Sequence, residues 1–151
     1  IKAPKWGKTA TKTAKMGLSE RARFTFKTKH RIFRASYLNP QIKNHSSTLF
    51  EGKLYIFGGY DGKKNHCNLR VFDTEKDCWL KPVKPGGQPP QGRNGHTATL
   101  VKNCLYIIGG WLGQGPFAAD DMHILDLKQF KWLNYEFTGE PPGPCNMHTS
   151  D

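Results

Sequence analysis

The sequence lacks an apolar run of the roughly 18–20 residues needed to cross a bilayer. No apolar signal-peptide segment follows Ile1, and phosphate-loop, nucleophile-elbow and zinc-site motifs are also missing. We therefore expect no catalytic residues, no cofactor and no metal. The cysteines form no Cys-x-x-Cys pair, which favours reduced thiols in an intracellular protein, cytoplasmic before nuclear; they are Cys67, Cys78, Cys104 and Cys145.

Acidic residues are scarce in the first third of the chain. Residues 1–44 hold twelve Lys or Arg and only one acid, Glu20, a net charge of +11, whereas residues 45–151 are balanced. Because Pro4 and two glycines disfavour one long helix, we predict that residues 1–30 form a basic arm, extended or disordered until it binds. The side chains expected to meet an acidic partner are Lys2, Lys5, Lys8, Lys12, Lys15, Arg21, Arg23, Lys27, Lys29, Arg31 and Arg34.

Two kinds of acidic partner fit the basic arm. Nucleic acid phosphates would release counterions on binding Lys and Arg. An acidic protein surface, such as a microtubule lattice in the cytoskeleton, fits equally well. A solvated tail without a specific partner also accounts for the charge. No membrane partner is expected, since the sequence has no apolar run long enough to cross a bilayer.

What is present is a repeat with a period of about 50 residues, the strongest signal in the sequence. His45 and His96 lie 51 residues apart, and the equivalent tryptophans lie 53 apart. A histidine, an apolar stretch ending in Gly-Gly, a tryptophan and a Pro-Pro pair recur in the same order. They are His45, Gly58, Gly59, Trp79, Pro89 and Pro90, and then His96, Gly109, Gly110, Trp132, Pro141 and Pro142.

Each copy of the repeat predicts four short antiparallel strands, because apolar runs alternate with turn signals and no helical period intervenes. The continuously apolar residues 54–57 and 105–108 predict strands that are buried on both faces. Asp73 and Asp126 should accept N–H groups in turns at strand ends. The fold class is therefore all-β, with strands expected at 45–50, 53–58, 68–73, 78–84, 96–101, 104–109, 121–126 and 131–137.

The repeated pattern resembles the kelch repeat of β-propeller proteins, over residues 40–148. The resemblance implies four-stranded blades in which the histidine bonds nearby backbone and the glycines and tryptophans are structural. Arg70 and His123 replace the aromatic residue that such repeats often carry between Gly-Gly and Trp. The implied organisation is an outer closing strand at 31–40, blades at 41–90 and 91–143, and the start of another blade at 144–151.

Two blades cannot close a ring, since propellers normally need about four to eight. We expect the sequence to be part of a longer polypeptide, with assembly of several copies into one ring as the alternative.

The resemblance also implies a function, which is protein binding through loops at one end of the blades. The leading hypothesis is a non-enzymatic scaffold or adaptor, anchored to an acidic surface by its basic arm. The alternatives are a substrate receptor of a ubiquitin ligase and a nucleic-acid-associated protein. Aromatic and basic side chains are typical of protein-binding surfaces; the loop residues expected at this binding face are Tyr60, Lys63, Lys64, His66, Arg93, Asn94, Trp111, Gln114 and Phe117.

Overall fold

The structure of the chain is a computed structural model that describes residues 41–82, 84–115 and 118–151. The predicted basic arm (1–30), the predicted closing strand (31–40) and Phe117 lie outside the described residues. Within the described part, no helix is long and apolar enough to span a membrane.

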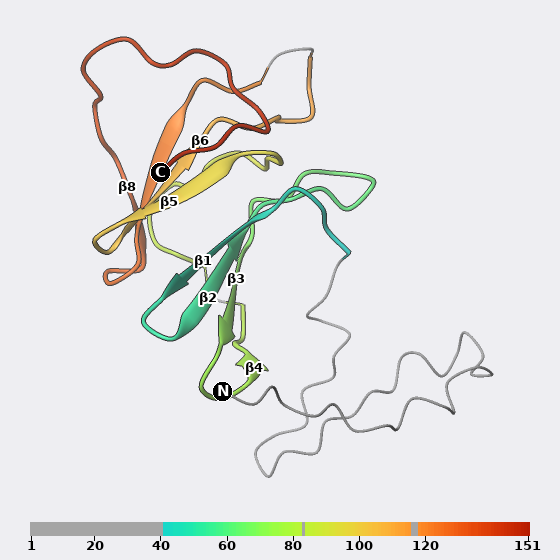
Figure 1. The fold of residues 1–151 in the computed structure, drawn as a ribbon, viewed down its shortest axis with the longest axis vertical. Coiled ribbons are helices and arrows are strands. Elements are labelled where there is room, and N and C mark those ends of the chain that lie inside the picture. Colours follow the sequence, from blue (N-terminus) through green and yellow to red (C-terminus); the bar gives the residue numbers. More distant parts are fainter. Residues whose placement is uncertain (1–40, 83, 116–117) are drawn as a thin grey trace, which may run out of the picture. The chain divides into compact units, whose positions relative to one another are not determined.

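The described residues form two sheets of four antiparallel strands each, and strands follow chain order within each sheet (Figure 1). This confirms the all-β prediction of two four-stranded blades. The first sheet comprises β1 (Ser46–Phe50), β2 (Lys53–Phe57), β3 (Leu69–Asp73) and β4 (Cys78–Trp79). The second comprises β5 (Thr97–Val101), β6 (Cys104–Ile108), β7 (Met122–Asp126) and β8 (Lys131–Leu133).

Local turn chemistry explains where strands β3 and β7 end. The Asp73 carboxylate accepts hydrogen bonds from the backbone N–H groups of Glu75 (3.2 Å) and Lys76 (2.9 Å). Asp126 accepts the equivalent bonds from residues 128 and 129, at 2.8 and 2.9 Å. A carboxylate that satisfies two turn N–H groups stabilises the reversal between strands. The expected role of both aspartates is confirmed.

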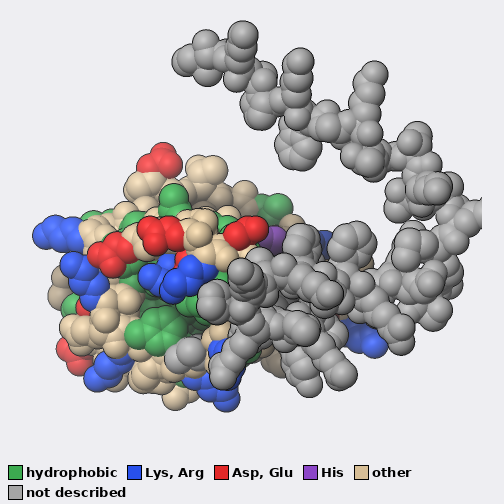
Figure 2. Space-filling view, turned by 90° about the horizontal axis from the view of Figure 1, so that it is seen from below, with side chains coloured by type: hydrophobic (Ala, Val, Ile, Leu, Met, Phe, Trp, Pro, Cys, Tyr) green, Lys and Arg blue, Asp and Glu red, His purple; other side chains and the backbone are tan. Residues whose placement is uncertain are grey.

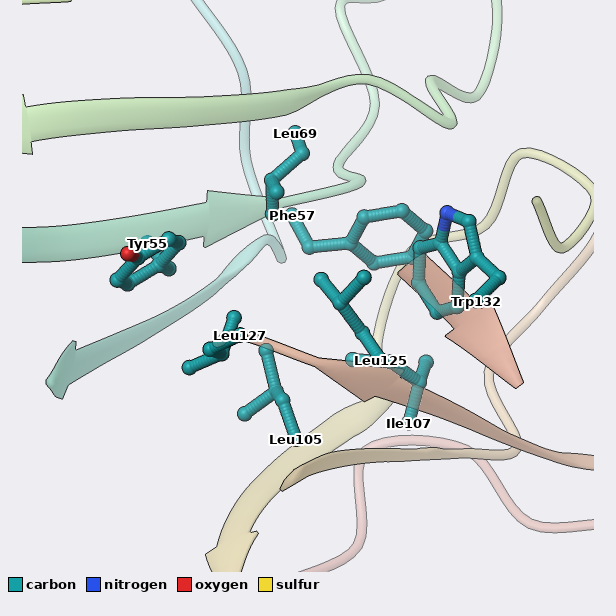
Figure 3. Close-up of a cluster of buried hydrophobic side chains, with 8 residues drawn as sticks. All are labelled: Tyr55, Phe57, Leu69, Leu105, Ile107, Leu125, Leu127 and Trp132. Atoms are coloured by element: carbon teal, nitrogen blue, oxygen red, sulfur yellow. The ribbon is translucent and has the colours of Figure 1, made fainter. Parts of the chain in front are cut away.

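The core lies between the two sheets, where each buries one face against the other (Figure 3). Phe57 and Ile107 are fully buried, and the rings of Phe57 and Trp132 meet edge to face at 5.5 Å. The residues of this cluster are Tyr55, Phe57, Leu69, Leu105, Ile107, Leu125, Leu127 and Trp132. The hydrophobic effect therefore acts mainly between the sheets, since burying a large apolar side chain stabilises the fold by about 1.5–3 kcal/mol.

The prediction that β2 and β6 are buried on both faces is wrong for the described residues. Side chains alternate along a strand, so only every second one points into the inter-sheet core. On the opposite faces Leu54, Ile56, Tyr106 and Ile108 are only half-buried. A blade can bury its second face only against another blade, and the described residues supply one contact between blades.

The fourth strands are shorter than predicted. Strand β4 ends at Trp79 rather than near residue 84, and β8 ends at Leu133 rather than near residue 137. In the first sheet Pro82 and Pro85 have no N–H group to donate to a ladder. In the second, Tyr135 and Phe137 are about half exposed, at 57% and 51%, so little burial holds the chain against β7.

The segment between the two sheets adds a short parallel contact to the outer edge of β8. Gly86 donates its N–H to the Phe130 carbonyl (3.0 Å) and accepts from the Trp132 N–H (2.8 Å). Gly87 follows with a φ of 77°, and a Cβ there would overlap the Trp132 carbonyl oxygen. Glycine is required at residue 87 because both the backbone conformation and the close approach exclude a side chain.

Candidate functional site

A groove of about 350 Å³ lies between a loop of the first sheet and a loop of the second. The first loop follows β2 and the second follows β6. Lys63, Lys64 and Gln114 are exposed at the groove, and Tyr60 and Trp111 are half-buried. We call this feature the binding groove; the residues that line it are Tyr60, Lys63, Lys64, Asn65, Gln91, Gly92, Trp111, Leu112, Gly113 and Gln114.

Five of the nine residues expected at a binding face line this groove: Tyr60, Lys63, Lys64, Trp111 and Gln114. The sequence pattern did not single out Asn65, Gln91 or the small residues between the loops. Turn composition does not predict a groove floor. The floor forms only where two loops that are about 50 residues apart in the sequence come together in space.

The loop after β2 is held by the carboxylate of Asp61. Its Oδ1 atom accepts the backbone N–H groups of Lys63 and Lys64, both at 2.8 Å. The other oxygen lies 2.7 Å from Nε2 of His66, which the sequence placed on the binding face. The N–H groups of Lys64 and Lys63, and then His66, hold the pKa of Asp61 well below its usual range. The two lysine side chains thus extend from a locally fixed backbone. His66 stabilises this loop through its contact with Asp61.

Asparagine side chains join the two walls of the groove. Asn65 donates its amide to the Trp111 carbonyl (2.9 Å) and accepts from the Asn94 amide (2.7 Å). A Cβ on Gly92 would lie 2.7 Å from the Asn65 carbonyl oxygen, so only glycine fits there. Asn94 also pairs with Trp111 through two backbone hydrogen bonds, at 3.1 and 2.8 Å. Asn94 is buried, at 7% exposure, and therefore supports the groove rather than presenting its side chain.

Arg93 is not a surface residue, which corrects its placement on the binding face. Its side chain is completely buried and forms a two-pronged ion pair with Asp121, with Nη2 2.8 Å from Oδ2. Nη1 also donates to the Gly109 carbonyl (2.8 Å) and contacts the other oxygen of Asp121. The guanidinium therefore ties the start of β5 to the end of β6 and the start of β7. Burial of an arginine requires such a partner.

Asp121 stays ionised because of this arrangement. Burial acts to raise the pKa of its carboxyl, but hydrogen bonds and charge from Arg93 and His123 hold that pKa well below the usual range. His123 Nε2 lies 2.8 Å from Asp121, two residues away in the chain.

The repeated histidines bond side chains rather than nearby backbone, which corrects the expectation for them. Nε2 of His96 lies 2.8 Å from the Ser46 hydroxyl of the first sheet. Nε2 of His148 lies 3.1 Å from the Thr97 hydroxyl, the equivalent position one repeat later. Each histidine thus links its own repeat to the first strand of the preceding one. Hydroxyls on those first strands supply the partner because adjacent repeats pack face to face.

His96 is buried at 7% exposure, and its ring meets that of Phe57 at 5.4 Å. Burial, followed by the positive charge of Arg93, lowers the pKa of His96 to about 4. In the unfolded chain His96 is protonated near pH 6.5, whereas in the folded chain it is protonated only near pH 4. We expect the free energy of unfolding to fall by about 3 kcal/mol as pH drops through this window, since one pKa unit is about 1.4 kcal/mol.

Denaturant titrations between about pH 7 and pH 4 test this expectation. His96→Gln removes the titrating ring and should flatten the profile over this interval. The charge of the exposed His45 is a smaller cause of the lowered pKa of His96, so His45→Gln should flatten the profile less than His96→Gln does. A steep slope that survives in His96→Gln would assign the pH dependence to another group.

The cysteines and the metal-ligating side chains of the described residues form no further candidate site. All four cysteines are free, and no cluster of three metal-ligating side chains occurs among the described residues. On the face shown in Figure 2, acidic and basic side chains lie side by side, in keeping with the balanced charge of residues 45–151.

Two successive four-stranded sheets packed face to face, with a His, a Gly-Gly pair and a Trp at equivalent places in each, are blades of a β-propeller. Residues 23–150 match the family described as the KLHDC2/KLHL20/DRC7 Kelch-repeats domain. The chain therefore belongs to the kelch-repeat family. The matched region begins at residue 23, inside the segment that the charge pattern assigns to the basic arm.

Curated relatives share the kelch region. The chain is 34% identical over 117 residues to acyl-CoA-binding domain-containing protein 5 from Arabidopsis thaliana, covering 75% of this chain and 18% of that protein. It is 32% identical over 98 residues to Rab9 effector protein with kelch motifs from Gallus gallus, and the match covers 64% of this chain and 26% of that protein. It is 29% identical over 107 residues to Kelch domain-containing protein 3 from Homo sapiens, and the match covers 70% of this chain and 28% of that protein. The matches thus span only 18–28% of these relatives.

Proposed function

We propose that this chain is a non-enzymatic protein-interaction scaffold whose binding groove holds a segment of a partner protein. The observation that carries the proposal is the groove itself, in which two exposed lysines and two aromatic side chains converge from different blades. Tyr and Trp supply large contact areas at protein interfaces, and fixed loops lower the entropic cost of binding.

The charge of the groove favours an acidic segment of the partner. Lys63 and Lys64 are exposed, and Asp61 is already occupied by backbone N–H groups and His66. The two ammonium groups are therefore free to attract carboxylates, which increases association rate and selectivity. Trp111 lies beside them with its indole N–H bonded to the Gly115 carbonyl at 3.2 Å, so its orientation is set before binding.

The names of related proteins support a protein partner. One relative is called a Rab9 effector, and another, from Dictyostelium discoideum, is called a Rho GTPase-activating protein. Both names describe proteins that act on or with other proteins. The kelch region is the part that this chain shares with them, and protein binding is the simplest function to transfer.

The basic arm forms the second part of the proposal. Residues 1–30 are proposed to anchor the scaffold to an acidic protein surface, because the first 44 residues carry a net charge of +11. The arm and the groove would then act separately, one as a general electrostatic anchor and one as a specific binding site.

Site-specific photo-crosslinking tests the groove without involving the arm. A photoreactive residue at Gln114 in the full chain should form adducts with partner proteins, whereas one at the exposed turn residue Gln129 should not. Replacing both lysines, Lys63→Glu with Lys64→Glu, should reduce adducts at residue 114 about tenfold, equivalent to about 1.4 kcal/mol. Lys128→Glu with Lys131→Glu, at two exposed lysines outside the groove, is the charge-matched control.

Equal labelling from residues 114 and 129, or labelling at 114 that is indifferent to the double charge reversal, would contradict binding in the groove. Circular dichroism of each variant would show that the fold is retained, because all of the substituted side chains are exposed.

A further inference from the structure

A single residue, Arg93, contacts the ends of both loops that form the binding groove. The first loop joins β2 to β3, and its ends are Gly59 and His66. The Arg93 carbonyl accepts the Gly59 N–H at 2.8 Å, and the Arg93 N–H donates to the His66 carbonyl at 3.2 Å. The main chain of Arg93 therefore holds both ends of the loop that presents the two groove lysines.

The side chain of Arg93 holds the second loop, which joins β6 to β7. Its Nη1 donates to the Gly109 carbonyl (2.8 Å) where β6 ends, and its Nη2 lies 2.8 Å from Oδ2 of Asp121, just before β7. The Gly109 N–H also donates to the Asp121 carbonyl at 3.0 Å. Trp111 and Gln114 line the groove from this loop. The buried guanidinium thus fixes both ends of the second groove wall.

The main-chain half of this arrangement belongs to the repeat, whereas the side-chain half does not. One repeat later, the Cys145 carbonyl accepts the Gly110 N–H (2.8 Å), and the Cys145 N–H donates to the Ala119 carbonyl (3.1 Å). A thiol cannot form a two-pronged ion pair with a carboxylate, and neither can Ile42, which holds the equivalent position one repeat earlier. The charged clamp is therefore specific to the boundary at which the groove lies.

We propose that Arg93 is the positioning residue of the binding groove, a role that rests on the proposed function of that groove. Arg93 bonds both walls, so a displacement of one loop must disturb the other. Asn65 joins the same walls through neutral hydrogen bonds to Asn94 and the Trp111 carbonyl. Hydrogen bonds to charged groups are roughly twice as strong as neutral ones. The Arg93–Asp121 pair therefore sets the wall geometry, and walls fixed before binding lower the entropic cost of holding a partner segment.

Two substitutions break this link with different risks to folding. Asp121→Asn retains the size of the side chain and a carbonyl oxygen for the guanidinium, but it removes the negative charge. Arg93→Gln retains the main-chain bonds of residue 93, and the Asp121 side chain that it leaves is 39% exposed and can be hydrated. If the two groups act as a pair, the double variant should behave like either single variant.

Hydrogen exchange of individual backbone amides, followed by NMR on the full chain, tests the coupling without a partner. The amides of Gly59 and of residue 93 report on the first loop, and the Gly109 amide reports on the second. Both variants should raise the exchange rates of all three amides about tenfold, because the loops open locally once the clamp is weakened. The rise at Gly59 is diagnostic, since Asp121 contacts only the second loop.

Two controls separate positioning from a general loss of stability. Trp79→Ala destabilises the fold outside the groove, and Asp120→Asn removes a charge from the exposed neighbour of Asp121. Neither should change exchange at the three amides, since local opening of loops does not depend on global stability. A rise at Gly109 alone, or an equal rise in Trp79→Ala, would overturn the proposal.

Photo-crosslinking then relates the coupling to binding. With the photoreactive residue at position 114, Asp121→Asn should reduce adducts with partner proteins about tenfold, and Asp120→Asn should not. Adducts that persist at the wild-type level while amide exchange rises would overturn the positioning role. A wild type that forms no adducts would contradict the proposed function of the groove, and amide exchange would still decide whether Arg93 couples its walls.

Discussion

Asp121→Ala should lower the free energy of unfolding by about 2–3 kcal/mol, less than the roughly 3–5 kcal/mol of a fully buried ion pair because the Asp121 side chain is 39% exposed. The substitution leaves the guanidinium of Arg93 completely buried without a counterion, with only the carbonyl oxygens of Gly109 and Gln91 in reach. Removing the counterion of a buried arginine costs more than the pair contributes, because the remaining charge is left unpaired. Urea denaturation at pH 7, followed by tryptophan fluorescence, measures the loss.

Asp120→Ala is the matched control, since this neighbouring aspartate is exposed and should change stability by less than about 0.5 kcal/mol. A second control uses pH. The pKa of Asp121 is lowered in the folded state, so its stabilisation is present above the ordinary aspartate pKa near 4 and is lost as pH falls further. The difference between wild type and Asp121→Asn should therefore narrow below about pH 4. Equal effects at positions 120 and 121 would contradict a structural role for the Arg93–Asp121 pair.

Trp132→Ala should destabilise the fold by about 3–5 kcal/mol, whereas Trp79→Ala should cost about 1–2 kcal/mol. The two tryptophans hold the same place in the repeat. Trp132 is 3% exposed and lies between the sheets against Phe57, so its removal leaves a cavity in the core. Trp79 is half-buried on the outward face and contacts Phe72, so water can fill part of the space it leaves.

Urea denaturation followed by circular dichroism compares the two variants with wild type. Equal losses for the two substitutions would contradict this difference and would mean that the first sheet is buried on both faces.

The features that follow from local sequence were predicted well. Alternating apolar residues, paired glycines and turn aspartates specify strands and reversals through contacts within a few residues, and the two four-stranded sheets confirm them. Hydrogen bonds from Asp73 and Asp126 to turn N–H groups are of this kind, since donor and acceptor are two or three residues apart.

Features that depend on distant residues were predicted less well. Arg93 resembled a loop residue at a binding face, but its partner Asp121 is 28 residues away, and only the packing of β5 beside β6 and β7 brings them together. Part of the binding groove also depends on residues that are distant in the sequence. Five of its residues were anticipated from loop position, while Asn65 and Gly92 depend on the approach of a loop from the next blade.

The sequence alone specified the repeat, the all-β fold class and the turns, because periodicity and short-range hydrogen bonds depend only on residues close together in the sequence. Tertiary structure decided which face of each apolar strand is covered, which polar residues are buried, and where a groove forms. Leu54 and Leu105 are the same residue at the same repeat position, yet one is half-buried and the other is 1% exposed. Burial is a property of the neighbouring blade, and no residue carries that information within its own strand.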